Sequence, residues 1–128
     1  FNILDKRLID SGVLYEIYNQ GIEVHARSVF LQGLLLMTEH SQLKQFNRWK
    51  SLWRLWHEWL GDNKLTALEA TIRYAISIPQ ISKVLVGVDS KNQLRDIIQA
   101  ADGNLPSIPK ELFTDDTDLL NPSNWVNL

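Results

Sequence analysis

The chain has 128 residues, of which 45% are apolar and 22% charged, the composition of an ordinary globular domain. Thirteen Lys and Arg residues against fifteen Asp and Glu give a net charge of −2, so no basic excess favours nucleic acid as a partner. The chain has no cysteine, which excludes disulfides and thiolate metal sites and makes a cytoplasmic location the default expectation. Its longest apolar run is too short to span a membrane, so we expect no membrane partner.

The N-terminal half predicts a helix, a strand and a second, longer helix. Apolar residues at helical spacing predict a helix over residues 8–19. Alternation over residues 22–26 predicts a strand, and a loop follows as far as Gly33. Apolar residues then recur every three or four positions over residues 41–60, which predicts a long amphipathic helix.

Four tryptophans fall on this predicted long helix, at positions 49, 53, 56 and 59. An aromatic stripe at helical spacing usually packs in a core. Trp56 and Trp59, however, cannot share the centre of one face, so part of the ring surface could instead face a substrate cleft or a partner subunit. A homo-oligomer formed through this helix is therefore one expectation.

The C-terminal half predicts helix, strand and helix, and then an irregular tail. Thr66 and Glu69 form a capping-box pattern that opens a helix, which must end before Pro79. Residues 81–86 suit a strand buried on both faces. Ser90 could cap a helix that ends near Gly103. The acidic run at residues 115–118 is typical of a solvated loop, with cation binding as the alternative.

This order of elements predicts an α/β fold with a parallel sheet. If Phe1 to Leu4 is the end of another strand, the chain contains three consecutive β/α units. That number is fewer than half of the units in an eight-stranded (β/α)8 barrel. We therefore expect the chain to be a fragment of a larger domain.

Two loops that follow predicted strands are the candidate functional segments, residues 25–33 and 87–93, because ligands in α/β folds bind where strands end. Gly87 lets a ligand approach the backbone, and Ser90 lies where a helix start could hold a phosphate, although a tight turn and a simple cap explain both residues. His25 is expected to be structural, and His40 and His57 to lie on the surface. No metal-ligand spacing occurs, so no metal site is predicted.

Four segments of the chain resemble segments of the aldo-keto reductase family, and they follow one another in the family's order. The run from Ile22 to Leu35 is similar to its seventh strand and following loop, commonly hydrophobic-x-(Tyr/Phe/Trp)-(Ser/Thr)-Pro-Leu-x-x-Gly-x-Leu. The run from Val84 to Leu94 is similar to the eighth strand and next helix, and Leu65 to Pro79 to the helix between them. Phe1 to Arg7 resembles the end of strand six. The resemblance implies that residues 1–128 are the C-terminal portion of one (β/α)8 TIM barrel domain, with an extra long helix after strand seven.

Members of that family bind a nicotinamide cofactor, NADP or NAD, and reduce an aldehyde or ketone by hydride transfer. Their Asp, Tyr, Lys and His tetrad lies on early strands of the barrel, so no catalytic residue is carried over to this sequence. The resemblance implies that the chain supplies the cofactor-binding side of a reductase and is inactive alone. Its partners would be a small carbonyl substrate and the remainder of the barrel. The alternative is a non-catalytic nucleotide-binding or interaction protein on the same fold.

The resemblance also implies which residues contact the cofactor. Arg27 falls where relatives stack an aromatic ring on the nicotinamide. Residues near the pyrophosphate would be Ser28, Phe30, Leu31 and Gln32, and residues around the adenosine end would be Gly87, Val88, Asp89, Gln93 and Asp96.

Departures from the family pattern bear on cofactor choice. Arg27 replaces the aromatic ring, and its charge should disfavour the cationic oxidised nicotinamide. Val29 replaces a proline and Ile97 an asparagine. Asp89 replaces a serine that commonly contacts the 2′-phosphate of NADPH, and a carboxylate there costs on the order of 1 kcal/mol. We therefore expect weak discrimination against NADH or a preference for it, unless Lys91 or Arg95 compensates.

Overall fold

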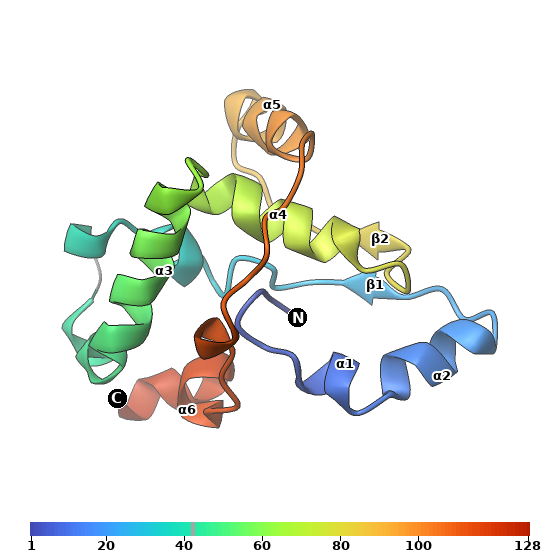
Figure 1. Ribbon diagram of the computed structural model, residues 1–128, viewed down its shortest axis with the longest axis horizontal. Coiled ribbons are helices and arrows are strands. Elements are labelled where there is room, and N and C mark those ends of the chain that lie inside the picture. The colour runs from blue at the N-terminus through green and yellow to red at the C-terminus, as the bar shows by residue number, and fades with distance from the viewer. Residues whose placement is uncertain (42) are drawn as a thin grey trace.

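The computed structural model describes residues 1–41 and 43–128 as a mostly helical chain with one small sheet (Figure 1). The α-helices are α1 (Arg7–Asp10), α2 (Val13–Asn19), α3 (Lys50–Asp62), α4 (Ala67–Ser77), α5 (Lys91–Ala100) and α6 (Thr117–Leu120). The strands are β1 (His25–Ala26) and β2 (Lys83–Val84). Short 3-10 helices are η1 (Leu34–Leu36), η2 (Glu39–Ser41), η3 (Lys44–Trp49), η4 (Lys110–Leu112) and η5 (Pro122–Asn127).

The two strands pair in parallel, with His25 opposite Lys83 and Ala26 opposite Val84. This pairing confirms the predicted parallel arrangement, and α3 and α4 lie between the strands in the chain. Both strands are shorter than predicted, and residues 81–86 are not buried on both faces, because Leu85 is 50% exposed. Residues 1–4 form a turn rather than a third strand. The family's barrel architecture therefore remains a prediction.

Two predicted helices differ from the observed ones at their ends. The helix expected over residues 8–19 is divided into α1 and α2 at Gly12, whose φ of 77° is incompatible with a continuous α-helix. The helix expected over residues 41–60 begins as α-helix only at Lys50, after the tighter η3. Position 42 lies outside the described residues.

The predicted caps of α4 and α5 are confirmed. Thr66 Oγ1 accepts the Glu69 backbone N–H at 3.2 Å, and the Glu69 carboxylate accepts the Thr66 backbone N–H at 2.8 Å. Ser90 Oγ accepts the Gln93 backbone N–H at 3.1 Å. Both helices therefore start where local sequence alone predicts, since a cap is formed by residues three positions apart.

The tryptophans of η3 and α3 form the main core. Trp49, Trp53, Trp56 and Trp59 are each 8% exposed or less. The rings of Trp56 and Trp59 stack at 5.7 Å. Their indole N–H groups donate to the backbone carbonyls of Leu35 and Ser107. The core interpretation is thus confirmed, and an oligomer formed through α3 would have to use its polar side.

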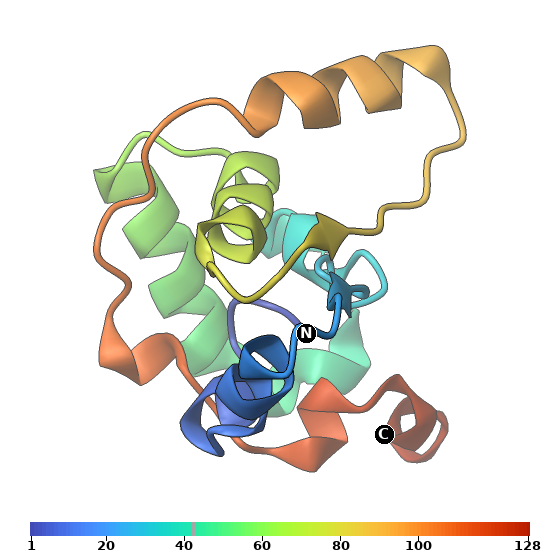
Figure 2. The same ribbon diagram turned by 90° about the vertical axis from the view of Figure 1, so that its right-hand side faces the viewer.

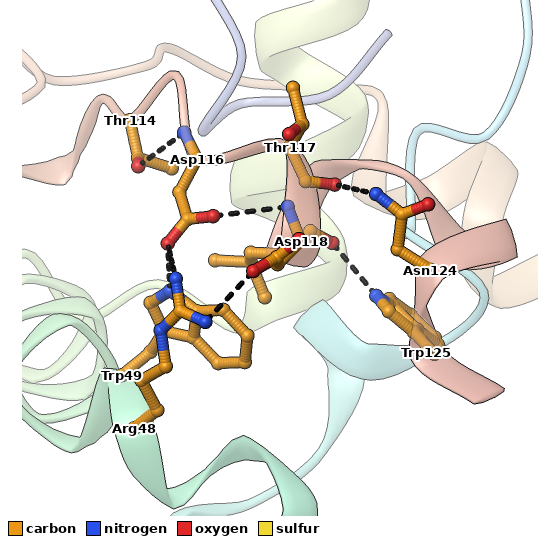
Figure 3. Close-up of polar contacts among 9 residues, drawn as sticks. Arg48, Trp49, Thr114, Asp116, Thr117, Asp118, Asn124 and Trp125 are labelled. Carbon is orange, nitrogen blue, oxygen red and sulfur yellow. Dashed lines mark hydrogen bonds and ion pairs between the residues drawn. The ribbon is translucent and has the colours of Figure 1, made fainter. Parts of the chain in front are cut away.

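The acidic run in the tail is an anchor rather than a solvated loop (Figure 3). Arg48 donates to Asp116 and to Asp118, each at 2.8 Å, and this contact holds α6 against η3. The tail, expected to be irregular, also forms η4 and η5. Within residues 1–41 and 43–128, no cluster of three or more His, Asp or Glu side chains could hold a metal ion.

Among the helices of the described chain, none combines the length and the apolarity that crossing a membrane requires.

Candidate functional site

The loops that follow β1 and β2 lie side by side and line one cleft. The Leu85 N–H donates to the Ala26 carbonyl at 2.8 Å, just beyond the paired residues, and this bond holds the loops together. The cleft has a volume of about 750 Å³, within the range of small-molecule sites. Its lining residues are Arg27, Ser28, Val29, Phe30, Gln32, Gly33, Leu85, Val86, Gly87, Val88 and Asp89.

The loop after β1 has an unusual backbone. Ser28, Leu31 and Gln32 have φ angles of 65°, 48° and 54°, in the left-handed region that non-glycine residues rarely adopt. Buried Val29 and Leu31, each 1% exposed, hold this conformation in place, while Ser28 and Gln32 are exposed. Such conformations cost about 1–3 kcal/mol each and gather at ligand sites. Buried and exposed residues therefore alternate along this loop.

The loop after β2 leads into α5 in an extended path (Figure 2). A Cβ atom added to Gly87 would meet nothing within 4 Å, so the backbone here is open to a ligand. The Gln93 side-chain carbonyl accepts the Asp89 N–H at 2.7 Å, and Ser90 caps the helix. The cap interpretation of Ser90 is therefore confirmed, whereas the Asp89 carboxylate has no ion-pair partner within the described residues.

A second hollow of about 220 Å³ adjoins the cleft and shares Phe30, Gly87 and Asp89 with it. Gln93 and Asp96 of α5 complete its polar rim. Its apolar wall is formed by Leu36, Leu68 and Ile97.

Most of the predicted site residues are brought together in this way. Seven of them line the large cleft, namely Arg27, Ser28, Phe30, Gln32, Gly87, Val88 and Asp89. Gln93 and Asp96 line the adjoining hollow. Leu31 is buried in the core, so it could reach a ligand only through its backbone.

Sequence reasoning missed Leu36 and Leu68, two of the three residues of the apolar wall. Leu68 comes from α4, and Leu36 lies beyond the predicted loop. The helical spacing of Leu68 from the buried Ile72 shows that it faces inward, but not that it faces a cavity.

The histidines lie outside both hollows. His25 contacts Glu23 at 2.6 Å, which supports its structural interpretation. Hydrogen bonds from Lys83 and His25 lower the pKa of Glu23. His57 is half-buried rather than a surface residue, and burial lowers its pKa below the ordinary value, so we expect it to be neutral at pH 7.

Comparison with known proteins identifies the family. The model of the Aldo/keto reductase family matches residues 1–109, which include both strands, both loops and α5. Neither the curated proteins nor the solved structures include a significant match to the chain. Because the family match covers most of the chain, the protein belongs to the aldo/keto reductase family, whose general function is that of an oxidoreductase.

Proposed function

We propose that this chain provides the nicotinamide-cofactor side of a reductase that transfers hydride to an aldehyde or ketone. The observation that carries the proposal is the cleft of about 750 Å³ between the β1 and β2 loops. The residues that the family resemblance relates to the cofactor lie along this cleft and the hollow beside it. If the two loops had unrelated roles, they would not need to line the same cavity.

The chemistry of the cleft fits a dinucleotide. Arg27 is the one cation among its lining residues and would face the pyrophosphate or the nicotinamide end. Gln32 and Ser28 are exposed hydrogen-bonding side chains beside it. At the other end, the Asp89 and Asp96 carboxylates could accept hydrogen bonds from ribose hydroxyls. The cofactor would supply the hydride, and the chain would bind and orient it.

The negative charge of Asp89, at one end of the cleft, favours NADH over NADPH. The Asp89 carboxylate is exposed and is not neutralised by an ion pair within the described residues. The 2′-phosphate of NADPH would lie against it, at a cost on the order of 1 kcal/mol. Lys91 and Arg95 are exposed on α5 and form no ion pair in the described part of the chain, so they are the charges that could offset this repulsion.

We also propose that further β/α units pack against this chain. Leu85, Leu94 and Ile98 are 50%, 43% and 65% exposed, and they lie on or beside the β2 edge and α5. Parallel sheets usually have more than two strands and are covered on both faces, so the exposed apolar residues beside this sheet offer a surface for further units. In the family, the catalytic tetrad belongs to such units, so this chain alone should bind cofactor without reducing a carbonyl compound.

A substitution at Gly87 tests the cofactor site. A leucine there would project into the cleft, and we expect Gly87→Leu to weaken NADH and NADPH binding by at least about tenfold. Gly61→Leu is the matched control, because Gly61 also has open space at its Cβ and lacks a positive φ. Binding is measured by the fluorescence of the reduced cofactor.

The result separates the two candidate functions. Equal binding by both variants would overturn the cofactor proposal. Cofactor binding without carbonyl reduction, when the chain is combined with the units that carry the tetrad, would favour a non-catalytic nucleotide-binding protein instead.

A further inference from the structure

A separate concave site lies between η2 and the start of α3, and it shares no residue with the cofactor cleft or the hollow beside it. Its volume is about 380 Å³. Its lining residues are Glu39, His40, Asn47, Lys50, Trp53 and Arg54. The cofactor proposal makes no use of this hollow.

One face of α3 supplies the positive charge of the hollow. Lys50 and Arg54 are four residues apart and therefore project from the same side of the helix. Trp53 lies between them in sequence, lines the same hollow and is 2% exposed, so the hollow combines two charged residues with a buried aromatic residue.

These cations are not neutralised within the described chain. Lys50 has no carboxylate within 4.0 Å there, and Arg54 has one contact, to Glu58 at 3.9 Å, in which both side chains are more than 60% exposed. Such an exposed pair contributes little. The Asn47 amide adds a hydrogen-bond donor at the same rim.

The opposite wall has a different chemistry. Glu39 and His40 of η2 face the hollow, and Glu39 can accept hydrogen bonds. The hollow therefore combines two cations and an amide on one side with a carboxylate acceptor on the other.

We propose that this hollow binds a small phosphate-bearing molecule that also carries hydroxyl groups. Lys50 and Arg54 would hold the phosphate, the Asn47 amide would donate to it, and the Glu39 carboxylate would accept a hydroxyl hydrogen. Two cations on one side of a helix suit the several oxygens of a phosphate group. The single carboxylate opposite selects a ligand with a donor rather than a bare anion.

Titration with glycerol 3-phosphate, followed by two-dimensional NMR of the backbone amides, tests the site directly. We expect shifts confined to residues 39–40 and 47–57, and not at residues 27–33 or 85–89 of the cofactor cleft. The double variant Lys50→Gln/Arg54→Gln should weaken binding by about tenfold or more. Gln has a similar helix propensity, so α3 should be retained.

The control is Lys64→Gln/Lys110→Gln, which removes the same charge from two exposed lysines outside the hollow. It should bind glycerol 3-phosphate as the unaltered protein does. Equal weakening by both double variants would show that binding follows only overall charge and would overturn the proposal. So would equal shifts with glycerol alone, or shifts confined to the cofactor cleft.

Discussion

Trp49 and Asp116 are joined by a hydrogen bond of 2.9 Å from the indole N–H to the carboxylate, across 67 residues of sequence. The Arg48 guanidinium donates to the same carboxylate oxygen at 2.8 Å (Figure 3). Asp116 lies beyond residue 109, the end of the family match. This contact therefore attaches the tail to the part of the chain that the family shares.

Asp116→Ala should loosen the tail. Trp49 is 8% exposed, so the substitution leaves a nearly buried N–H without its acceptor, at a cost of about 1–3 kcal/mol. Hydrogen exchange should quicken across α6 and η5 while α4 keeps its protection. Asp115→Ala is the control, since Asp115 is exposed, and unchanged exchange in the Asp116 variant would contradict the anchoring role.

The anchor should also weaken in acid. The hydrogen bond from Trp49 is the main cause that holds the pKa of Asp116 below its ordinary value of 3.8, and Asp118 and Arg48 add to it. A lowered carboxyl pKa contributes stability that is present above the ordinary value and is lost as the pH falls through the lowered one. Urea midpoints of the protein and of Asp116→Asn should therefore converge only once the pH falls below the lowered pKa of Asp116. A gap that persists there would argue against this ionisation.

Gly103→Ala should destabilise the turn after α5. Gly103 has a φ of +121°, and an added Cβ would lie 2.8 Å from the Arg73 Cζ. Arg73 is held by the Ala100 carbonyl and by Glu69, so it has little room to move. A loss of about 1–3 kcal/mol in the free energy of unfolding is expected. Gly87→Ala, in open space without a positive φ, should have little effect by comparison.

Asp89→Ser should move cofactor preference toward NADPH. Removing the carboxylate relieves repulsion of the 2′-phosphate, which is on the order of 1 kcal/mol, or several-fold in affinity. Binding of NADPH and of NADH is measured for this variant and for Asp102→Ser, whose exposed carboxylate lies outside both hollows. An unchanged ratio of the two affinities in Asp89→Ser would mean that Asp89 does not face the phosphate.

Trp56→Ala should cost about 3–5 kcal/mol, because the ring is 0% exposed and its removal leaves a large cavity. Circular dichroism and urea titration measure the loss. Trp125→Ala is the comparison, since Trp125 is only half-buried and its ring makes a T-shaped contact with Phe46. An intact fold with altered substrate affinity in the Trp56 variant would place that ring in a cleft instead.

Features encoded by neighbouring residues could be predicted from the sequence. The caps at Thr66 and Ser90 each depend on a residue three positions away, and both are present. The parallel pairing of the two strands followed from the order of elements and fixed which loops lie together. Because those loops leave the same end of the sheet, the two segments that line the cleft could be named in advance, whereas the individual cofactor residues came from the family resemblance.

Features that depend on distant residues could not be predicted in this way. The acidic tail has the composition of a solvated loop, and only folding brings Arg48 to it from 68 residues away. Each strand has a single neighbour and pairs with it over only two residues, which no local pattern reveals. The break at Gly12 depends on one positive φ within an otherwise helical pattern.

The pairing of β1 with β2 joins segments 58 residues apart, so its formation closes a long loop of chain. Closing such a loop is entropically costly unless the intervening helices have already shortened it. We therefore expect the helices between the strands to form early in refolding and the cofactor cleft to form late. Recovery of cofactor affinity should then lag behind recovery of helical signal when the denatured protein is diluted into buffer.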